Sequence, residues 1–357
     1  MPPRLLHRDA FVGQVGGRAV SLYVLRSPQM QAAFCNHGAR LLQLVVPDRW
    51  GEPRDVVLGH DSLAQLLAGM PSMGAFIGRY ANRIGRGHLL IGRRRYSLPA
   101  NDGPNCLHGG PGGSRHQVFS VLAHDDEHLR LGWRFCTDND GFPGEVDLEL
   151  EYRLLGSALQ VSYNAEVRAD ATPLSLTFHP FFNLEGASSA SALDHCLQIL
   201  ADRFVPVDAG RLPLGSFEQV AGSAFDFRQA RSVREALAQG HAQLSLGAVT
   251  GFDHAFSTPG EPGRMRRQAR LHAPVSGIAM ELWSDAPCLQ FYSGANLDGQ
   301  LPRHAGKDGQ IYRSGAALCL EPQQFPDAPN QPHFPACIYP PGAQVRGQIQ
   351  YRFFTEA

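Results

Sequence analysis

The stretch Val146–Val167, VDLELEYRLLGSALQVSYNAEV, decides the fold, because apolar and polar residues alternate along it on either side of one short turn. In its first half, the apolar residues that share a face are Val146, Leu148, Leu150, Tyr152 and Leu154. Leu159–Val167 repeats the alternation. Successive side chains of a strand point to opposite faces, so the pattern predicts two strands with one face on a core and one in water. Leu155–Ser157, with Gly156 at its centre, predicts the hairpin turn.

Similar short apolar runs fill the rest of the chain, separated by abundant Gly (38) and Pro (26), which is typical of an all-β protein. We expect strands over residues 21–25, 32–35, 41–46, 270–273, 278–284, 289–293, 317–321 and 344–354, and hairpins over 88–98 and 117–135. Only residues 63–68 and 232–239 favour helices. Because strands and helices do not alternate, a parallel doubly wound sheet is disfavoured. The sequence predicts a large antiparallel β-sandwich that forms a single domain over residues 1–357.

The charge of the chain limits its partners. A formal net charge of −1 provides no strong field for phosphate backbones or anionic lipid. No apolar run is long enough for a membrane span, and the N-terminus, MPPRLLHRDAFVG, has no apolar segment of a secretory signal. We therefore expect a small, near-neutral ligand, with no nucleic acid and no membrane as partner. A monomer or a weak dimer is the default expectation.

The seven cysteines are widely spaced and form no CxxC pair. This usage predicts neither a disulfide framework nor a zinc knuckle. Free thiols are typical of a reducing compartment, so a cytoplasmic location is expected. No HExxH sequence and no close His/Cys pair at metal-ligand spacing occurs, and a phosphate-loop Gly-Lys-Ser/Thr is absent. The sequence therefore predicts no metal and no nucleotide cofactor.

Five polar clusters interrupt the strand pattern at the expected strand ends. They are GRYANRIG (78–85), NDGPNCLHGG (101–110), TFHPFFNLEG (177–186), GFDH (251–254), and the pair QFYSGANLDG (290–299) with LEPQQFPDAPN (320–330). In the third, His179 stands beside aromatic residues, and its imidazole titrates near neutral pH, which suits proton transfer to a sugar. In the last, Glu321 follows an apolar run, where burial raises a carboxyl pKa and favours a base active near neutrality.

Each of these residues also has a structural interpretation. His179 can be a packed core histidine, and Glu321 can form a buried ion pair with an arginine. Arg83, beside Asn82, offers donors to sugar oxygens or forms a surface salt bridge. His108 can contact the ligand or be a turn residue. Asp253 can accept hydrogen bonds from sugar hydroxyls or cap a turn.

The chain resembles the aldose 1-epimerase, or galactose mutarotase, family. Seven segments carry the resemblance, in the family's order: GRYANRIGRG, LPANDGPNCLHGG, HPFFNLEG, FDFR, GFDH, QFYSGANLDG and LEPQQFPDAPNQPHFP. The resemblance implies a β-sandwich with a sugar cleft, a small-molecule aldose as substrate, and no cofactor. It further implies that His179 is the general acid and Glu321 the general base. The residues that match those holding sugar oxygens are Asn82, Arg83, His108, Asp253 and Gln290.

Interconversion of anomers requires the C1–O5 bond of the sugar to open and reclose. We expect ionised Glu321 to take the O1 proton while protonated His179, on the opposite side of the sugar, donates to O5. Arg83 and His108 would stabilise charge on the ring oxygen. Two alternatives remain at this point: a glycoside hydrolase with Asp253 as second carboxylate, and a protein for a modified or phosphorylated sugar, catalytic or only sugar-binding. The rim arginines for a phosphate would be Arg79, Arg86 or Arg303.

Overall fold

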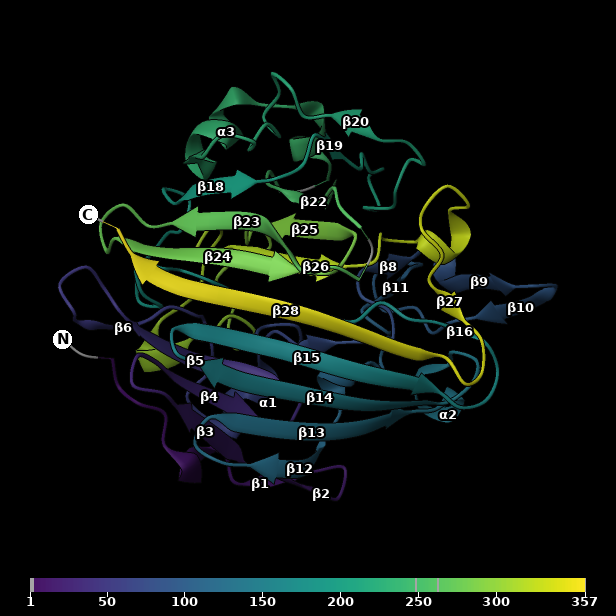
Figure 1. The fold of residues 1–357 in the computed structure, drawn as a ribbon, viewed down its shortest axis with the longest axis horizontal. Coiled ribbons are helices and arrows are strands. Elements are labelled where there is room, and N and C mark those ends of the chain that lie inside the picture. Colours follow the sequence, from purple (N-terminus) through teal and green to yellow (C-terminus); the bar gives the residue numbers. More distant parts are fainter. Residues whose placement is uncertain (1–2, 248, 262, 357) are drawn as a thin grey trace.

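A computed structural model describes residues 3–247, 249–261 and 263–356. Its largest sheet has nine strands in the order β12-β13-β14-β15-β28-β24-β23-β18-β21, all paired antiparallel. The bounds are β12 Ser120–His124, β13 His128–Phe135, β14 Val146–Leu155, β15 Ala158–Val167, β18 Cys196–Ile199, β21 Arg231–Ser232, β23 Arg266–His272, β24 Ile278–Ser284 and β28 Gln344–Thr355. In Figure 1 the long C-terminal strand β28 runs between β15 and β24, so the end of the chain completes the middle of this sheet.

The predicted hairpin is confirmed as β14 and β15, which pair along their whole length from Val146 opposite Val167 to Leu155 opposite Ala158. Gly156 in the turn adopts φ 60°, a left-handed conformation that glycine reaches without a steric cost. Buried residues alternate with more exposed ones along β14, as the sequence pattern requires. The charged residues of this strand therefore face solvent, and its apolar face contributes to the core.

Two smaller antiparallel sheets oppose the large one. The first has the order β20-β19-β22-β25-β26 and the second β3-β4-β5-β6. Their bounds are β3 Leu22–Arg26, β4 Gln31–Cys35, β5 Arg40–Pro47, β6 Pro53–Asp55, β19 Arg203–Phe204, β20 Glu218–Gln219, β22 Asp253–Ser257, β25 Cys288–Tyr292 and β26 Cys319–Gln323. The two-stranded pairs are β1 Gly13–Val15 with β2 Arg18–Val20, β7 Phe76–Ile77 with β17 Thr177–Phe178, β8 Arg83–Ile84 with β11 Cys106–Leu107, β9 His88–Ile91 with β10 Arg94–Ser97, and β16 Thr172–Pro173 with β27 Ile338–Tyr339.

One continuous hydrophobic core joins the three larger sheets. Leu150 of β14 and Val161 of β15 belong to it, together with Leu44 of β5, Phe291 of β25 and Leu320 of β26. Each is fully or almost fully buried, and burying one such side chain contributes about 1.5–3 kcal/mol. Apolar faces of separate sheets packed on one core make a β-sandwich, so the predicted fold class is confirmed.

Helices are few and short in the described residues. Both predicted helices are present, as α1 Leu63–Ala68 and α3 Val233–Gln239. A third, α2 Thr137–Asp140, was not predicted, because one turn is too short to show a helical period. The 3₁₀ turns are η1 Arg8–Phe11, η2 Gly85–Gly87, η3 Ser114–His116, η4 Ala242–Ser245, η5 Lys307–Gly309 and η6 Ala328–Asn330. In this part of the chain, no helix has the length and apolarity needed to cross a membrane.

Strand boundaries differ from expectation at two places that matter. Strand β23 begins at Arg266, four residues before the predicted start at residue 270. The prediction missed this part because Arg266–Gln268 are polar and show no apolar alternation. Strand β26 continues to Gln323, so Glu321 lies inside this strand and not at its end. All residues of β26 are buried, since the core covers one face and the residues described below cover the other.

Candidate active site

A cleft of about 460 Å³ collects the polar clusters that the sequence singles out. All of the predicted site residues line it: Asn82, Arg83, His108, His179, Asp253, Gln290 and Glu321. They come from β8 and the residue before it, from the loops after β11 and β17, and from the neighbouring strands β22, β25 and β26. Segments that are far apart in the sequence therefore form one site.

Strands β25 and β26 supply the floor of the cleft. Gln290 and Glu321 are directly opposite each other in the ladder, and they are only 3% and 2% exposed. Their sequence neighbours Phe291 and Leu320 point into the main core. Because strand side chains alternate, the same two strands present apolar groups to the core and polar groups to the cleft. The Gln290 Nε2 group donates to Asp253 Oδ1 at 2.7 Å, which links this floor to β22.

His179 follows directly after β17, and its main chain is held on both sides. Its N–H donates to the Ala75 carbonyl at 3.0 Å, and its carbonyl accepts from the Gly74 N–H at 2.9 Å. The imidazole stacks on the Phe181 ring, with centroids 5.0 Å apart and an interplanar angle of 6°. Its rotation is therefore restricted by the aromatic residue that the sequence places two positions later.

The proposed acid and base are immediate neighbours. His179 Nε2 lies 3.5 Å from Glu321 Oε2. This separation leaves no room for a sugar ring between them, so the expectation that they stand on opposite sides of a pyranose is wrong. O1 and O5 are both bonded to C1, and two groups this close can reach both oxygens from the same side of the sugar.

Burial determines the protonation of this pair. It raises the pKa of Glu321 well above its usual value, and the nearby Asp253 charge raises it further. Burial also lowers the pKa of His179 to about 3. The raised carboxyl pKa agrees with the sequence argument, whereas a protonated His179 in this structure does not. The neutral pair, a Glu321 carboxylic acid beside a neutral His179 imidazole, has the same number of protons as the charged pair of carboxylate and imidazolium. Transfer of one proton from Glu321 to His179 converts the neutral pair into the charged pair.

The backbone fixes the hydrogen-bonding role of His108. Its ring Nδ1 accepts from the backbone N–H of Asn82 at 3.1 Å, and the backbone N–H of His108 donates to the Asn82 carbonyl at 2.9 Å. Burial lowers the pKa of His108 well below its usual value, so the ring is neutral and carries its hydrogen on Nε2. His108 therefore presents a donor to the cleft, and its ring meets that of His179 edge-on at 5.5 Å.

His108 and Asn82 both have an unusual backbone conformation. His108 has φ 56° and Asn82 has φ 64°, both in the left-handed region, which costs a non-glycine residue free energy. Gly109 follows with φ 78°, and a Cβ there would lie 2.3 Å from the Gly78 carbonyl oxygen. The glycine of the Leu-His-Gly-Gly sequence thus permits the close approach that orients His108.

Arg83 forms an ion pair and lines the cleft as well. Its Nε donates to Asp102 Oδ2 at 2.7 Å, and its Nη1 lies 3.9 Å from Asp253 Oδ2. The side chain is only 12% exposed. The salt bridge that the sequence allowed is therefore present, and it orients the guanidinium within the cleft, whereas the sugar-binding role stays a prediction.

His108, His179 and Glu321 offer one ligand atom each within 4.8 Å of one another, a set that is compatible with a metal ion. The sequence spacing did not show this cluster, because the three residues come from separate elements. The His108 tautomer argues against metal binding. The Asn82 N–H occupies the lone pair on Nδ1, so Nε2 bears a hydrogen where a metal would need a lone pair.

The structure separates the arginines named for a phosphate. Arg303 lines the cleft. Arg79 is fully buried and binds Asp140 through Nε at 2.9 Å, so its assignment to the cleft rim is wrong. Arg86 is not among the lining residues. Arg115, which was not predicted as a site residue, also lines the cleft and lies in η3. Its only sequence signal is its position five residues after the Leu-His-Gly-Gly cluster.

The chain is similar to known proteins over nearly its whole length. The family model described as aldose 1-epimerase matches residues 21–352. Galactose mutarotase of Bos taurus is 37% identical over 341 residues, which cover 95% of each chain. Aldose 1-epimerase of Escherichia coli (strain K12) is 31% identical over 344 residues, or 95% of this chain and 97% of that relative.

Among solved structures, the aldose epimerase homologue from C. elegans superposes with a TM-score of 0.86 at 28% identity. The match covers 95% of this chain and all of that one. Galactose 1-epimerase from Lactobacillus acidophilus has the same fold, with a TM-score of 0.83. From the family match over nearly its whole length and its similarity to these relatives, the chain belongs to the aldose 1-epimerase family.

Proposed function

We propose that this protein interconverts the α and β anomers of a free aldohexose such as glucose or galactose. Membership of the family makes the chain an isomerase that acts on carbohydrates. The observation that carries the proposal is the 3.5 Å contact between His179 and Glu321 inside a cleft lined by sugar-binding side-chain types.

The reaction needs two coordinated proton transfers. Transfer of a proton from Glu321 to His179 first gives the carboxylate and the imidazolium. Glu321 then accepts the O1 hydroxyl proton while His179 donates to O5, so the C1–O5 bond breaks and a C1=O1 double bond forms. The open aldehyde turns about C1–C2, and the reverse transfers close the ring on its other face. Protons and electrons balance within the sugar and these two side chains.

The other cleft residues hold the sugar and its developing charge. Arg83 and the Nε2–H of His108 donate to the ring oxygen, where they stabilise negative charge. Asp253 and Gln290 are already joined by a hydrogen bond and bind vicinal hydroxyl groups as a unit. Asn82 acts through its backbone, since its N–H sets the His108 tautomer. Together these contacts fix C1 beside the acid–base pair.

Polarimetry on freshly dissolved α-D-glucose and α-D-galactose tests these roles. Glu321→Gln and His179→Asn are each expected to lower kcat by roughly 10²–10⁴-fold, since each removes one proton-transfer partner. Glu218→Gln and His88→Asn change the same residue types at exposed positions outside the cleft and serve as matched controls. If both cleft variants keep the wild-type rate, the role assignment is wrong.

We also propose a cytoplasmic location and a monomer or weak dimer. The support for the location is that the cysteines are free, which suits a reducing compartment. Cell fractionation tests the location. Light scattering across a range of protein concentrations tests the oligomeric state.

A further inference from the structure

The lining of the cleft carries more positive than negative charge. Three arginines line the cleft: Arg83, Arg115 and Arg303. Arg83 is paired with Asp102 and lies near Asp253, so the two charged carboxylates of the lining both contact this one arginine. Among the described residues, neither of the other two has a carboxylate within ion-pair distance. The remaining cleft carboxyl group, Glu321, is held neutral by burial, so it does not offset them.

Arg115 is buried, and it binds only neutral groups. Its Nη1 donates to Ser72 Oγ at 2.8 Å, its Nη2 to the Leu107 carbonyl at 3.3 Å, and its Nε to His116 Nε2 at 3.2 Å. Only 6% of the residue is exposed. Burial lowers its pKa to about 10, with a further decrease from the charge of Arg303, so the side chain stays positive at neutral pH. Asp102 acts on this charge from beyond ion-pair distance. A buried cation without a contacting counterion is costly, and a bound anion would reduce that cost.

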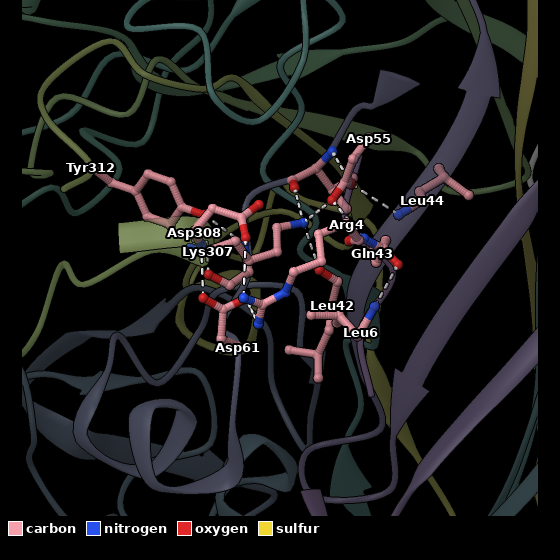
Figure 2. A network of polar contacts seen from close by, with 12 residues as sticks. Arg4, Leu6, Leu42, Gln43, Leu44, Asp55, Asp61, Lys307, Asp308 and Tyr312 are labelled. Carbon is pink, nitrogen blue, oxygen red and sulfur yellow. Dashed lines mark hydrogen bonds and ion pairs between the residues drawn. The ribbon is translucent and has the colours of Figure 1, made fainter. Parts of the chain in front are cut away.

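Arg303 is exposed, but the loop that carries it is firmly attached on its C-terminal side. His304 Nδ1 lies 2.7 Å from Asp298 Oδ1, which ties the residue after Arg303 to the preceding part of the loop. The Gly306 carbonyl accepts from Gln65 Nε2 at 2.8 Å. Next along the chain, Lys307 contacts Asp55 at the end of β6, in the four-stranded sheet β3-β4-β5-β6 (Figure 2). The chain thus fixes the backbone position from which Arg303 extends over the cleft.

We propose that the preferred substrates of this enzyme are aldoses that carry an anionic group, a carboxylate or a phosphate, which binds Arg115 and Arg303. Guanidinium groups bind both anions through paired, charge-assisted hydrogen bonds. The inference rests on the proposed mutarotase function, because it places C1 of the same sugar at Glu321 and His179. It goes beyond that function by naming the substrate class.

The test measures enzyme-dependent kcat/KM for two matched pairs: D-galacturonate against D-galactose, and D-glucose 6-phosphate against D-glucose. One charge-assisted contact predicts a preference of roughly 10- to 100-fold for an anionic member. Preference for the uronate alone or for the phosphate alone supports the proposal and identifies the anion. Added salt is expected to reduce the preference, since Arg303 is exposed.

Arg303→Gln is expected to reduce the ratio of anionic to neutral kcat/KM by roughly 10-fold, and Arg303→Lys to restore part of it. Arg264→Gln, which removes an exposed arginine outside the cleft, is the control and leaves the ratio unchanged. Equal kcat/KM within both pairs, or a ratio unaffected by Arg303→Gln, overturns this inference and leaves the mutarotase function standing. Absence of catalysis with all four sugars overturns the proposed function instead.

Discussion

His108 illustrates how a single residue obtains its role from its backbone neighbour. Because the Asn82 N–H holds Nδ1, the Nε2–H is available to the sugar. We predict that His108→Gln lowers kcat by roughly 10²–10³-fold, the loss typical for one donor to a developing oxyanion. Polarimetry measures the rate, and far-UV circular dichroism checks the fold. His88→Gln, at an exposed position, is the control. An unchanged kcat in His108→Gln would contradict the donor role.

The Glu321–His179 pair predicts a distinctive pH dependence. The pair is active while it holds one transferable proton. The lowered pKa of His179, about 3, means that a second proton is gained only in strong acid. The raised pKa of Glu321 means that the first proton is lost only well above the usual carboxyl range. We therefore expect kcat/KM to be flat through pH 5–7 and to decrease toward alkaline pH.

Polarimetry corrected for the buffer-catalysed reaction at each pH measures this profile. An acidic decrease with a midpoint near pH 6.5, the usual histidine value, would show that His179 is not desolvated in the free enzyme. Circular dichroism at each pH separates loss of activity from loss of structure.

At the scale of elements, Lys307 joins the loop beside the cleft to the four-stranded sheet β3-β4-β5-β6. Its ammonium group donates to the carbonyls of Leu42 at 2.9 Å and Val57 at 2.7 Å, and it forms an ion pair with Asp55, as Figure 2 shows. Lys307 is only 4% exposed. The only lysine of the sequence is thus a buried anchor, a role that no pattern in the sequence indicates.

We predict that Lys307→Met destabilises the protein by about 3–5 kcal/mol, because Asp55 would remain buried without a counterion. Urea unfolding monitored by fluorescence measures the change. Lys307→Met combined with Asp55→Asn is expected to recover part of the loss, since the uncompensated charge is then removed. Equal stability of Lys307→Met and the wild type would contradict the anchoring role.

At the scale of the whole molecule, the division into domains stays a prediction: one unit over residues 1–357. Its support is the core that joins residues of the nine-, five- and four-stranded sheets. A chain with one shared core unfolds cooperatively, so we expect a single transition that coincides by fluorescence and by far-UV circular dichroism. Two separated transitions would show that the chain contains more than one folding unit.

The sequence by itself determined the antiparallel β-fold, because the alternation in Val146–Val167 is local and needs no knowledge of the partner strand. Its family motifs also named the residues that line the cleft. Strand boundaries with polar residues, such as the start of β23 at Arg266, were missed because the pattern reports only apolar faces.

Only the tertiary structure decided how the site residues stand to one another. It placed His179 3.5 Å from Glu321, and it buried His179 deeply enough to lower its pKa to about 3. It also buried Arg79 against Asp140 and brought Arg115 to the cleft. Distance and desolvation depend on which distant segments pack together, and no local pattern in the chain encodes either quantity.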